Sequence, residues 1–156
     1  MEKRRTTVTV TFDITLEENY DLLKKIFDLD KNFKLNQEEA LYWAVENNNI
    51  KVVKLLIEAG ADVTADYNCP IQAASENGHT EVVKLLIETG ADVTACNNYA
   101  IRWASDNGHA EVVELLIEAG ADVTVDDNYA IRCASRKDHT KVVKLLKEAL
   151  RNNKKS

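Results

Sequence analysis

The chain has 156 residues, the size of a single domain, with 45% hydrophobic residues and a formal net charge of −6. No stretch approaches the roughly twenty consecutive apolar residues of a membrane-spanning helix, so we expect no membrane contact. The three cysteines are an odd number without a Cys-x-x-Cys pair. This argues against a disulfide framework or a zinc ribbon and favours free thiols in a reducing cytoplasm.

The first fifteen residues predict a single β-strand. Val8, Val10, Phe12 and Ile14 alternate with threonines and one aspartate, which is the two-residue period of a half-buried strand. No second strand pattern follows, so this strand needs a partner elsewhere. Two arrangements stay open. The strand folds over the first repeat as a cap, which we favour together with a monomer, or it pairs with the same strand of another chain and makes a homodimer.

A helix is predicted after this strand, because Thr15 and Glu18 occupy the first and fourth places of a capping box. Beyond it, the sequence Gly-Ala-Asp-Val-Thr recurs at 60–64, 90–94 and 120–124 without any insertion. A fixed period of thirty residues is typical of a solenoid, in which each unit buries its apolar face against its neighbours. We divide the chain into an N-terminal strand plus helix that form a partial repeat and cap (1–35), repeat 1 (36–65), repeat 2 (66–95), repeat 3 (96–125), a C-terminal capping repeat (126–150) and a basic tail (151–156).

Each repeat predicts two antiparallel helices. In the second helix, Val82, Leu85 and Leu86 stand at i, i+3 and i+4, which is the apolar stripe of a helix packed on its neighbours. A glycine such as Gly90 supplies the left-handed residue that ends it. The first helix is expected to begin at an asparagine whose side-chain oxygen caps it. These asparagines are Asn36, Asn68, Asn98 and Asn128.

The segment from Pro70 to Val93 (PIQAASENGHTEVVKLLIETGADV) resembles the ankyrin repeat, and the resemblance extends over 36–150. It implies a mainly α, ankyrin-like solenoid whose first helices line a concave, protein-binding groove. Ankyrin units have about thirty-three residues. Here three are missing between Val93 and Ile101, so we expect the hairpin finger to be shortened or lost. The replaced helix start, Tyr-Ala-Ile-Arg, is similar to a short form abundant in giant DNA viruses; viral origin and repeat design both fit this pattern.

The resemblance places the partner surface on the exposed side of each first helix, opposite its small buried residues. Tyr, Trp and Arg are the usual energetic anchors of interfaces, and this side grades from acidic to basic along the chain. The candidate partner-binding residues are Tyr42, Trp43, Glu46, Glu76, Tyr99, Arg102, Trp103, Asp106, Tyr129, Arg132 and Arg136. For the two tryptophans a packing role stays open, because large and small residues alternate at their position in successive repeats.

His79, His109 and His139 recur at one position of the repeat, but stacked helices lie about 8–10 Å apart, whereas zinc ligands lie about 2 Å from one ion. We therefore expect them to form hydrogen bonds between repeats, and we expect no metal. No carboxylate pair, nucleophile beside a base or glycine-rich phosphate loop stands out, so we expect neither enzyme activity nor a cofactor.

The charge distribution argues against nucleic acid as a partner, because the middle of the chain is acidic and repels phosphate. The basic residues after position 136 suit the polar outer face that a terminal repeat needs. Our leading hypothesis is a non-enzymatic, cytoplasmic protein-interaction module. The alternative is an engineered or structural repeat scaffold without a natural ligand that associates with itself through the strand of residues 8–14.

Overall fold

The computed structural model of the chain describes residues 37–153, which are all helices and short connections. The strand predicted at residues 8–14, the helix after it and the choice between cap and dimer lie outside this range. The helices are α2 (Gln37–Glu46), α3 (Ile50–Glu58), α4 (Ala65–Glu76), α5 (Thr80–Glu88), α6 (Ala95–Asp106), α7 (Ala110–Glu118), α8 (Val125–Arg136) and α9 (Thr140–Asn153).

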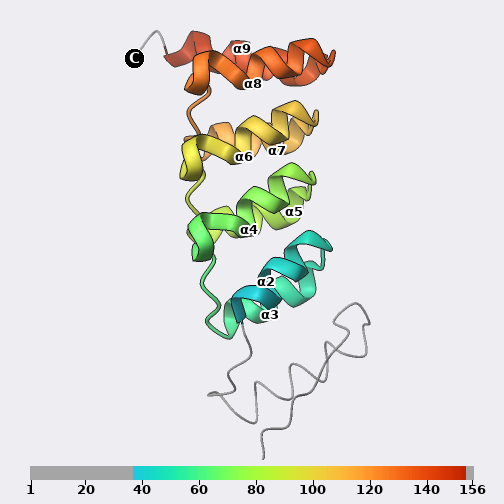
Figure 1. The fold of residues 1–156 in the computed structure, drawn as a ribbon, viewed down its shortest axis with the longest axis vertical. Coiled ribbons are helices and arrows are strands. Elements are labelled where there is room, and N and C mark those ends of the chain that lie inside the picture. The colour runs from blue at the N-terminus through green and yellow to red at the C-terminus, as the bar shows by residue number, and fades with distance from the viewer. Residues whose placement is uncertain (1–36, 154–156) are drawn as a thin grey trace, which may run out of the picture.

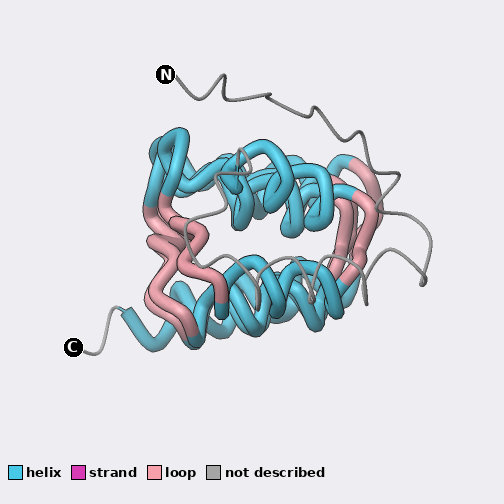
Figure 2. The backbone as a smooth tube through the Cα atoms, turned by 90° about the horizontal axis from the view of Figure 1, so that it is seen from below, coloured by secondary structure: helices cyan, strands magenta, loops and turns pink. Residues whose placement is uncertain are grey.

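The helices form pairs that stack in chain order, as Figure 1 shows. Each first helix packs on the next first helix, so α2, α4, α6 and α8 make one layer. The second helices α3, α5, α7 and α9 make the other, and the view at right angles shows the two layers joined by loops at both sides (Figure 2). The predicted helical solenoid is confirmed for the described part of the chain. Within that part, no helix is long and apolar enough to cross a membrane.

Apolar side chains at equivalent positions of the four pairs build one continuous core. Leu56, Leu86, Leu116 and Leu146 form a ladder in which no side chain is more than 1% exposed. Burying a leucine stabilises a fold by about 1.5–3 kcal/mol, and the ladder repeats this contribution in every unit. The first helices approach one another over small residues such as Ala104, which is fully buried. The predicted apolar stripe and small face are both present.

A left-handed turn precedes the right-handed part of each first helix. In α4, the φ angles of Asp66, Tyr67 and Asn68 are 47°, 60° and 64°, and the same conformation recurs at 96–98 and 126–128. The N–H of Asn68 closes the turn on the carbonyl of Thr64 at 3.0 Å. Left-handed residues other than glycine cost about 1–2 kcal/mol each, and Asn and Asp tolerate the conformation best. In the third repeat this compact turn lies between Val93 and Ile101, where the resemblance to the longer ankyrin repeat led us to expect a shortened or lost hairpin finger.

The turn asparagines connect repeats instead of capping their own helices. The side-chain oxygen of Asn68 accepts the backbone N–H of Asp92, and that of Asn98 accepts the N–H of Asp122, both at 2.7 Å. The prediction of N-caps at Asn68, Asn98 and Asn128 is therefore wrong, because all three lie in left-handed turns inside helices that begin earlier. Asn36 lies outside the described residues. Asparagine suits both roles, but its left-handed backbone here points the side chain toward the following repeat. Two of the four predicted caps thus stabilise the stack itself.

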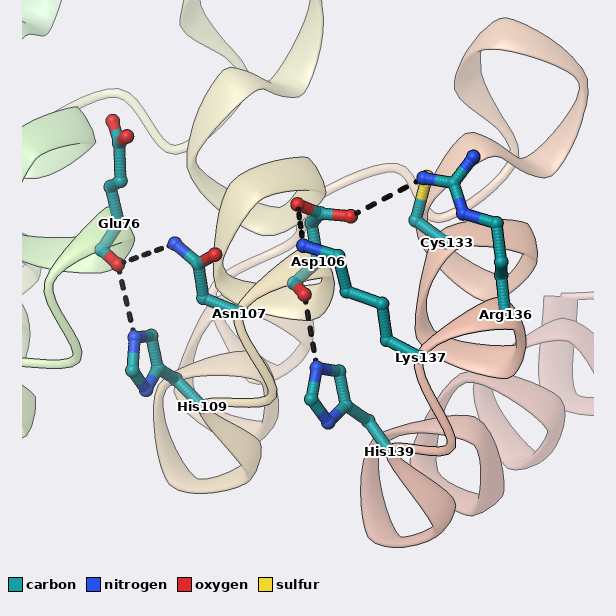
Figure 3. Close-up of polar contacts among 8 residues, drawn as sticks. All are labelled: Glu76, Asp106, Asn107, His109, Cys133, Arg136, Lys137 and His139. Atoms are coloured by element: carbon teal, nitrogen blue, oxygen red, sulfur yellow. Dashed lines mark hydrogen bonds and ion pairs between the residues drawn. The ribbon is translucent and has the colours of Figure 1, made fainter.

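The histidine ladder also connects repeats, as predicted. The Nε2–H groups of His79, His109 and His139 donate to the backbone carbonyls of Glu46, Glu76 and Asp106, each at 3.0 Å. Two of these bonds are visible in Figure 3. Each imidazole thereby satisfies a carbonyl at the end of the preceding first helix, where no intrahelical donor remains. Within residues 37–153, no group of three or more His, Cys, Asp or Glu side chains could hold a metal ion.

Candidate functional site

One surface collects side chains from all four first helices, and we call it the first-helix surface. Because each unit repeats the same helix in the same orientation, side chains thirty residues apart line up along the stack. The surface keeps most of the predicted partner-binding positions together and adds Cys69 and Gln72 of α4. It consists of Tyr42, Glu46, Cys69, Gln72, Glu76, Tyr99, Arg102, Tyr129, Arg132 and Arg136.

The acidic half of this surface contains a hollow of about 370 Å³, which we call the tyrosine–glutamate hollow. Tyr42, Glu46, Glu76 and Tyr99 line it, together with the small side chain of Ala73. The hydroxyl of Tyr42 donates to Oε1 of Glu46 at 2.8 Å, and the hydroxyl of Tyr99 donates to Oε2 of Glu76 at 3.0 Å. Each tyrosine therefore holds one carboxylate in place within the hollow.

Burial and the hydrogen bonds to the two carboxylates raise the pKa values of both tyrosines. The hydrogen bond to Glu46, followed by burial, raises the pKa of Tyr42 to about 12. For Tyr99, burial comes first and the hydrogen bond to Glu76 second, and both raise its pKa above the ordinary value. An anionic phenolate would repel the adjacent carboxylate, so both tyrosines stay protonated to a higher pH than an ordinary tyrosine.

The basic half is organised around Arg102 on α6. Its guanidinium forms an ion pair with Asp126 at 2.8 Å and lies over the ring of Tyr129, 5.0 Å from the ring centre. A cation over an aromatic face is attracted by the ring quadrupole. Arg132, thirty residues further on, is exposed and donates to the backbone carbonyl of Asp126 at 3.2 Å. The predicted residues Arg102 and Tyr129 are thus in contact, while Arg132 remains open to solvent.

Both tryptophans are partly buried, so each contributes to packing. Trp43 packs against the core. The ring of Trp103 lies 5.6 Å from that of Tyr99 at a tilt of 36°, and its Nε1–H is buried without a hydrogen-bond partner in the described part of the chain. Leaving a buried donor unpaired costs about 1–3 kcal/mol. A binding role for the two tryptophans stays a proposal.

Asp106 is the candidate that the structure removes from the surface. It is only 6% exposed, and its carboxylate pairs with Nζ of Lys137 at 2.6 Å and more loosely with Arg136 at 3.9 Å. The prediction of an exposed Asp106 is wrong because the following repeat covers it (Figure 3). Sequence reasoning missed Lys137 as its partner. The sequence does contain a signal for this ion pair, because Lys137 carries the opposite charge and follows Asp106 by 31 residues, close to the length of one repeat.

The three cysteines differ in exposure: Cys96 is exposed, Cys69 is half-buried and Cys133 is buried. Cys69, Cys96 and Cys133 are unpaired, which agrees with the prediction of free thiols. Burial, and then the nearby Asp66, raises the pKa of the Cys69 thiol, whereas a reactive cysteine needs a lowered pKa. The histidine rings face backbone carbonyls through Nε2.

A family model for ankyrin repeats matches the chain in three copies, over residues 13–97 and 63–127. Among curated proteins, none matches the chain. The family match begins within the segment that we assigned to the partial repeat and spans most of the sequence. The stacked helix pairs, linked by the histidine ladder and the turn asparagines, account for that match in physical terms. The chain belongs to the ankyrin repeat family.

Proposed function

We propose that this chain is a non-enzymatic protein-interaction module that binds a protein or peptide through its first-helix surface. Ankyrin repeats are generally protein-interaction modules, which supports the class of function. The surface and the nature of the partner are proposed from the side chains of this chain. The free thiols also favour action in the reducing cytoplasm.

The observation that carries the proposal is the contrast between core and surface across the repeats. The buried ladder of residues 56, 86, 116 and 146 is leucine in every unit. At one position of the first-helix surface, the same four units carry Tyr42, Gln72, Arg102 and Arg132. Side chains that differ in size and charge on an otherwise repeating frame create a surface without internal repetition. Such a surface can distinguish one partner from another, which a uniform face cannot do.

The second helices provide the comparison within the same chain. Their exposed positions, for example Glu81, Lys84 and Glu88 on α5, are almost all lysine or glutamate. These are the residues of an ordinary solvated helix face. Interface anchors are instead enriched in Tyr, Trp and Arg, which concentrate on the first helices. This favours the first-helix surface over the opposite face of the stack.

A selection from a displayed library of random peptides tests this proposal. Peptides that bind the full chain are measured against a surface variant, Tyr42→Ala with Arg132→Ala, and against a control variant, Lys84→Ala with Glu118→Ala on the second helices. We expect the surface variant to weaken binding by about tenfold or more, the effect of losing interface anchors, and the control to leave it unchanged. Peptides that bind both variants equally well, or that depend on the second helices, would show that the surface is wrongly chosen. Failure to select any binder would favour the structural scaffold.

A further inference from the structure

We infer that the tyrosine–glutamate hollow binds a lysine or arginine side chain of the partner. This inference rests on the proposed function, because it assigns a chemistry to part of the first-helix surface. The hollow has a volume of about 370 Å³ and lies between α2, α4 and α6. That volume falls within the roughly 300–1,000 Å³ of typical small-ligand sites and exceeds what one amino-acid side chain needs.

The lining of the hollow contains two glutamates and no lysine or arginine. Among the ion pairs found in the described part of the chain, none involves Glu46 or Glu76. Each of these carboxylates receives a tyrosine hydroxyl at one oxygen. A carboxylate offers about four acceptor sites, so both retain capacity for a charged donor.

The chain itself holds an ammonium group at the same position of a later repeat. Glu46, Glu76 and Asp106 occupy one position in successive repeats. The ammonium group of Lys137 sits on the Asp106 carboxylate at 2.6 Å, whereas its equivalent one repeat earlier is Asn107, which donates to the backbone carbonyl of Glu76 at 2.9 Å. Figure 3 shows both sites side by side, with the Glu76 carboxylate turned away from Asn107. The register accepts an ammonium group where the chain provides one, and the first two sites lack it.

The lining of the hollow suits an amino-acid side chain better than a metal ion. A lysine or arginine side chain has an apolar stem and a charged head, and Tyr42 and Tyr99 supply aromatic surface for the stem beside carboxylates for the head. Ion pairs that also form hydrogen bonds are the stronger ones. A divalent metal ion fits less well, because the described residues include no group of three or more ligands that could hold one.

An amide NMR titration of the full chain with Nα-acetyl-lysine methylamide tests the inference. The uncharged norleucine analogue is the matched control ligand. We expect saturable shifts at residues around the hollow with lysine and none with norleucine. The variant Glu46→Gln with Glu76→Gln should weaken lysine binding by about fivefold, the upper range for exposed ion pairs, while Glu88→Gln on α5 should not change it.

Equal shifts with norleucine, shifts spread evenly over the acidic second helices, or no saturable shift at all would each overturn the inference. The peptides selected on the first-helix surface separate it from the proposed function. If they bind through that surface yet contain no essential Lys or Arg and tolerate Glu46→Gln with Glu76→Gln, the cation site is wrong and the interaction module stands. If their binding ignores the surface altogether, the proposed function fails by itself.

Discussion

Replacing Gly78 with alanine tests how tightly the histidine ladder locks one repeat onto the next. Gly78 has a φ of +73°, and an added Cβ would lie 2.5 Å from Nδ1 of His109. The left-handed backbone alone costs alanine about 1–2 kcal/mol. The close contact also forces the imidazole away from the Glu76 carbonyl, which loses a hydrogen bond worth about 0.5–1.5 kcal/mol. Adding the two contributions, we expect Gly78→Ala to lower the free energy of unfolding by about 1.5–3.5 kcal/mol.

A double-mutant cycle separates the two contributions. In a His109→Ala background the contact is absent, so Gly78→Ala should cost only the backbone part, about 1–2 kcal/mol. Gly90→Ala is the matched control, because Gly90 also has a positive φ, +102°, but an added Cβ would meet nothing within 4 Å. Its cost should be the same with and without the imidazole. The assay is urea unfolding followed by far-UV circular dichroism, with the slope of the transition checked for each variant.

Gly78→Ala could lower the free energy of unfolding equally in the unmodified chain and in the His109→Ala variant, within about 0.5 kcal/mol, the usual error of additivity. That outcome would refute the proposed coupling between Gly78 and His109. That result would mean that the imidazole moves aside freely and that its hydrogen bond to Glu76 contributes little. The effects of Gly90→Ala and His109→Ala on the free energy of unfolding should be additive, because a Cβ added at Gly90 contacts no other residue. Non-additive effects of these two substitutions would also contradict this explanation. A change in the slope would instead indicate that the repeats no longer unfold together.

Three further predictions concern the turns and the assembly. Tyr67 is 83% exposed with a φ of +60°, so Tyr67→Asn should raise the free energy of unfolding by up to about 1 kcal/mol in the same urea assay; a loss of stability would show that the ring contributes a contact. Three aspartates in the turns each accept hydrogen bonds from the threonine two residues further along the chain, and these bonds lower the pKa of the aspartate. Such an aspartate stabilises the fold fully at a pH above its pKa in the unfolded chain, about 3.9. This stabilisation is lost as the pH falls through the lower pKa of the folded protein. Stability should therefore decline below about pH 4, and Asp92→Asn should remove part of that decline; an unaltered acid limb would contradict it. These aspartates are Asp62, Asp92 and Asp122. Finally, light scattering should give a monomer both for the full chain and for a version that starts at Thr15; a dimer that dissociates on truncation would favour strand pairing between chains.

Features that recur along the chain could be predicted well. The apolar spacing of residues such as Val82 and Leu86 repeats in every unit, and a period near 3.6 within each unit indicates a helix without any knowledge of its neighbours. The hydrogen bond of His109 between repeats could also be predicted, because residues at the same position of successive repeats lie too far apart to bind a single metal ion. Each of these arguments depends only on spacing within a helix or on the repeat length.

Polar side chains at the repeat boundaries could not be placed in this way. Asn68 favours both an N-cap and a left-handed backbone, and the second preference prevails because its oxygen reaches Asp92, 24 residues later. Asp106 looked like a surface residue by helical angle, yet Lys137 of the next repeat covers and neutralises it. In both cases the deciding partner belongs to another unit, so local propensity has no access to it.

Periodicity within the chain is enough to predict the helical solenoid, the continuous leucine core and the division into first and second helices. Packing between repeats then fixes which polar groups the stack uses internally and which stay available. It places Asp106, His109 and Asn68 in contacts between repeats, and it brings Glu46 and Glu76 into one hollow whose lining contains no lysine or arginine. The physical reason is that charge and hydrogen-bond capacity become functional only after neighbouring repeats have satisfied part of them.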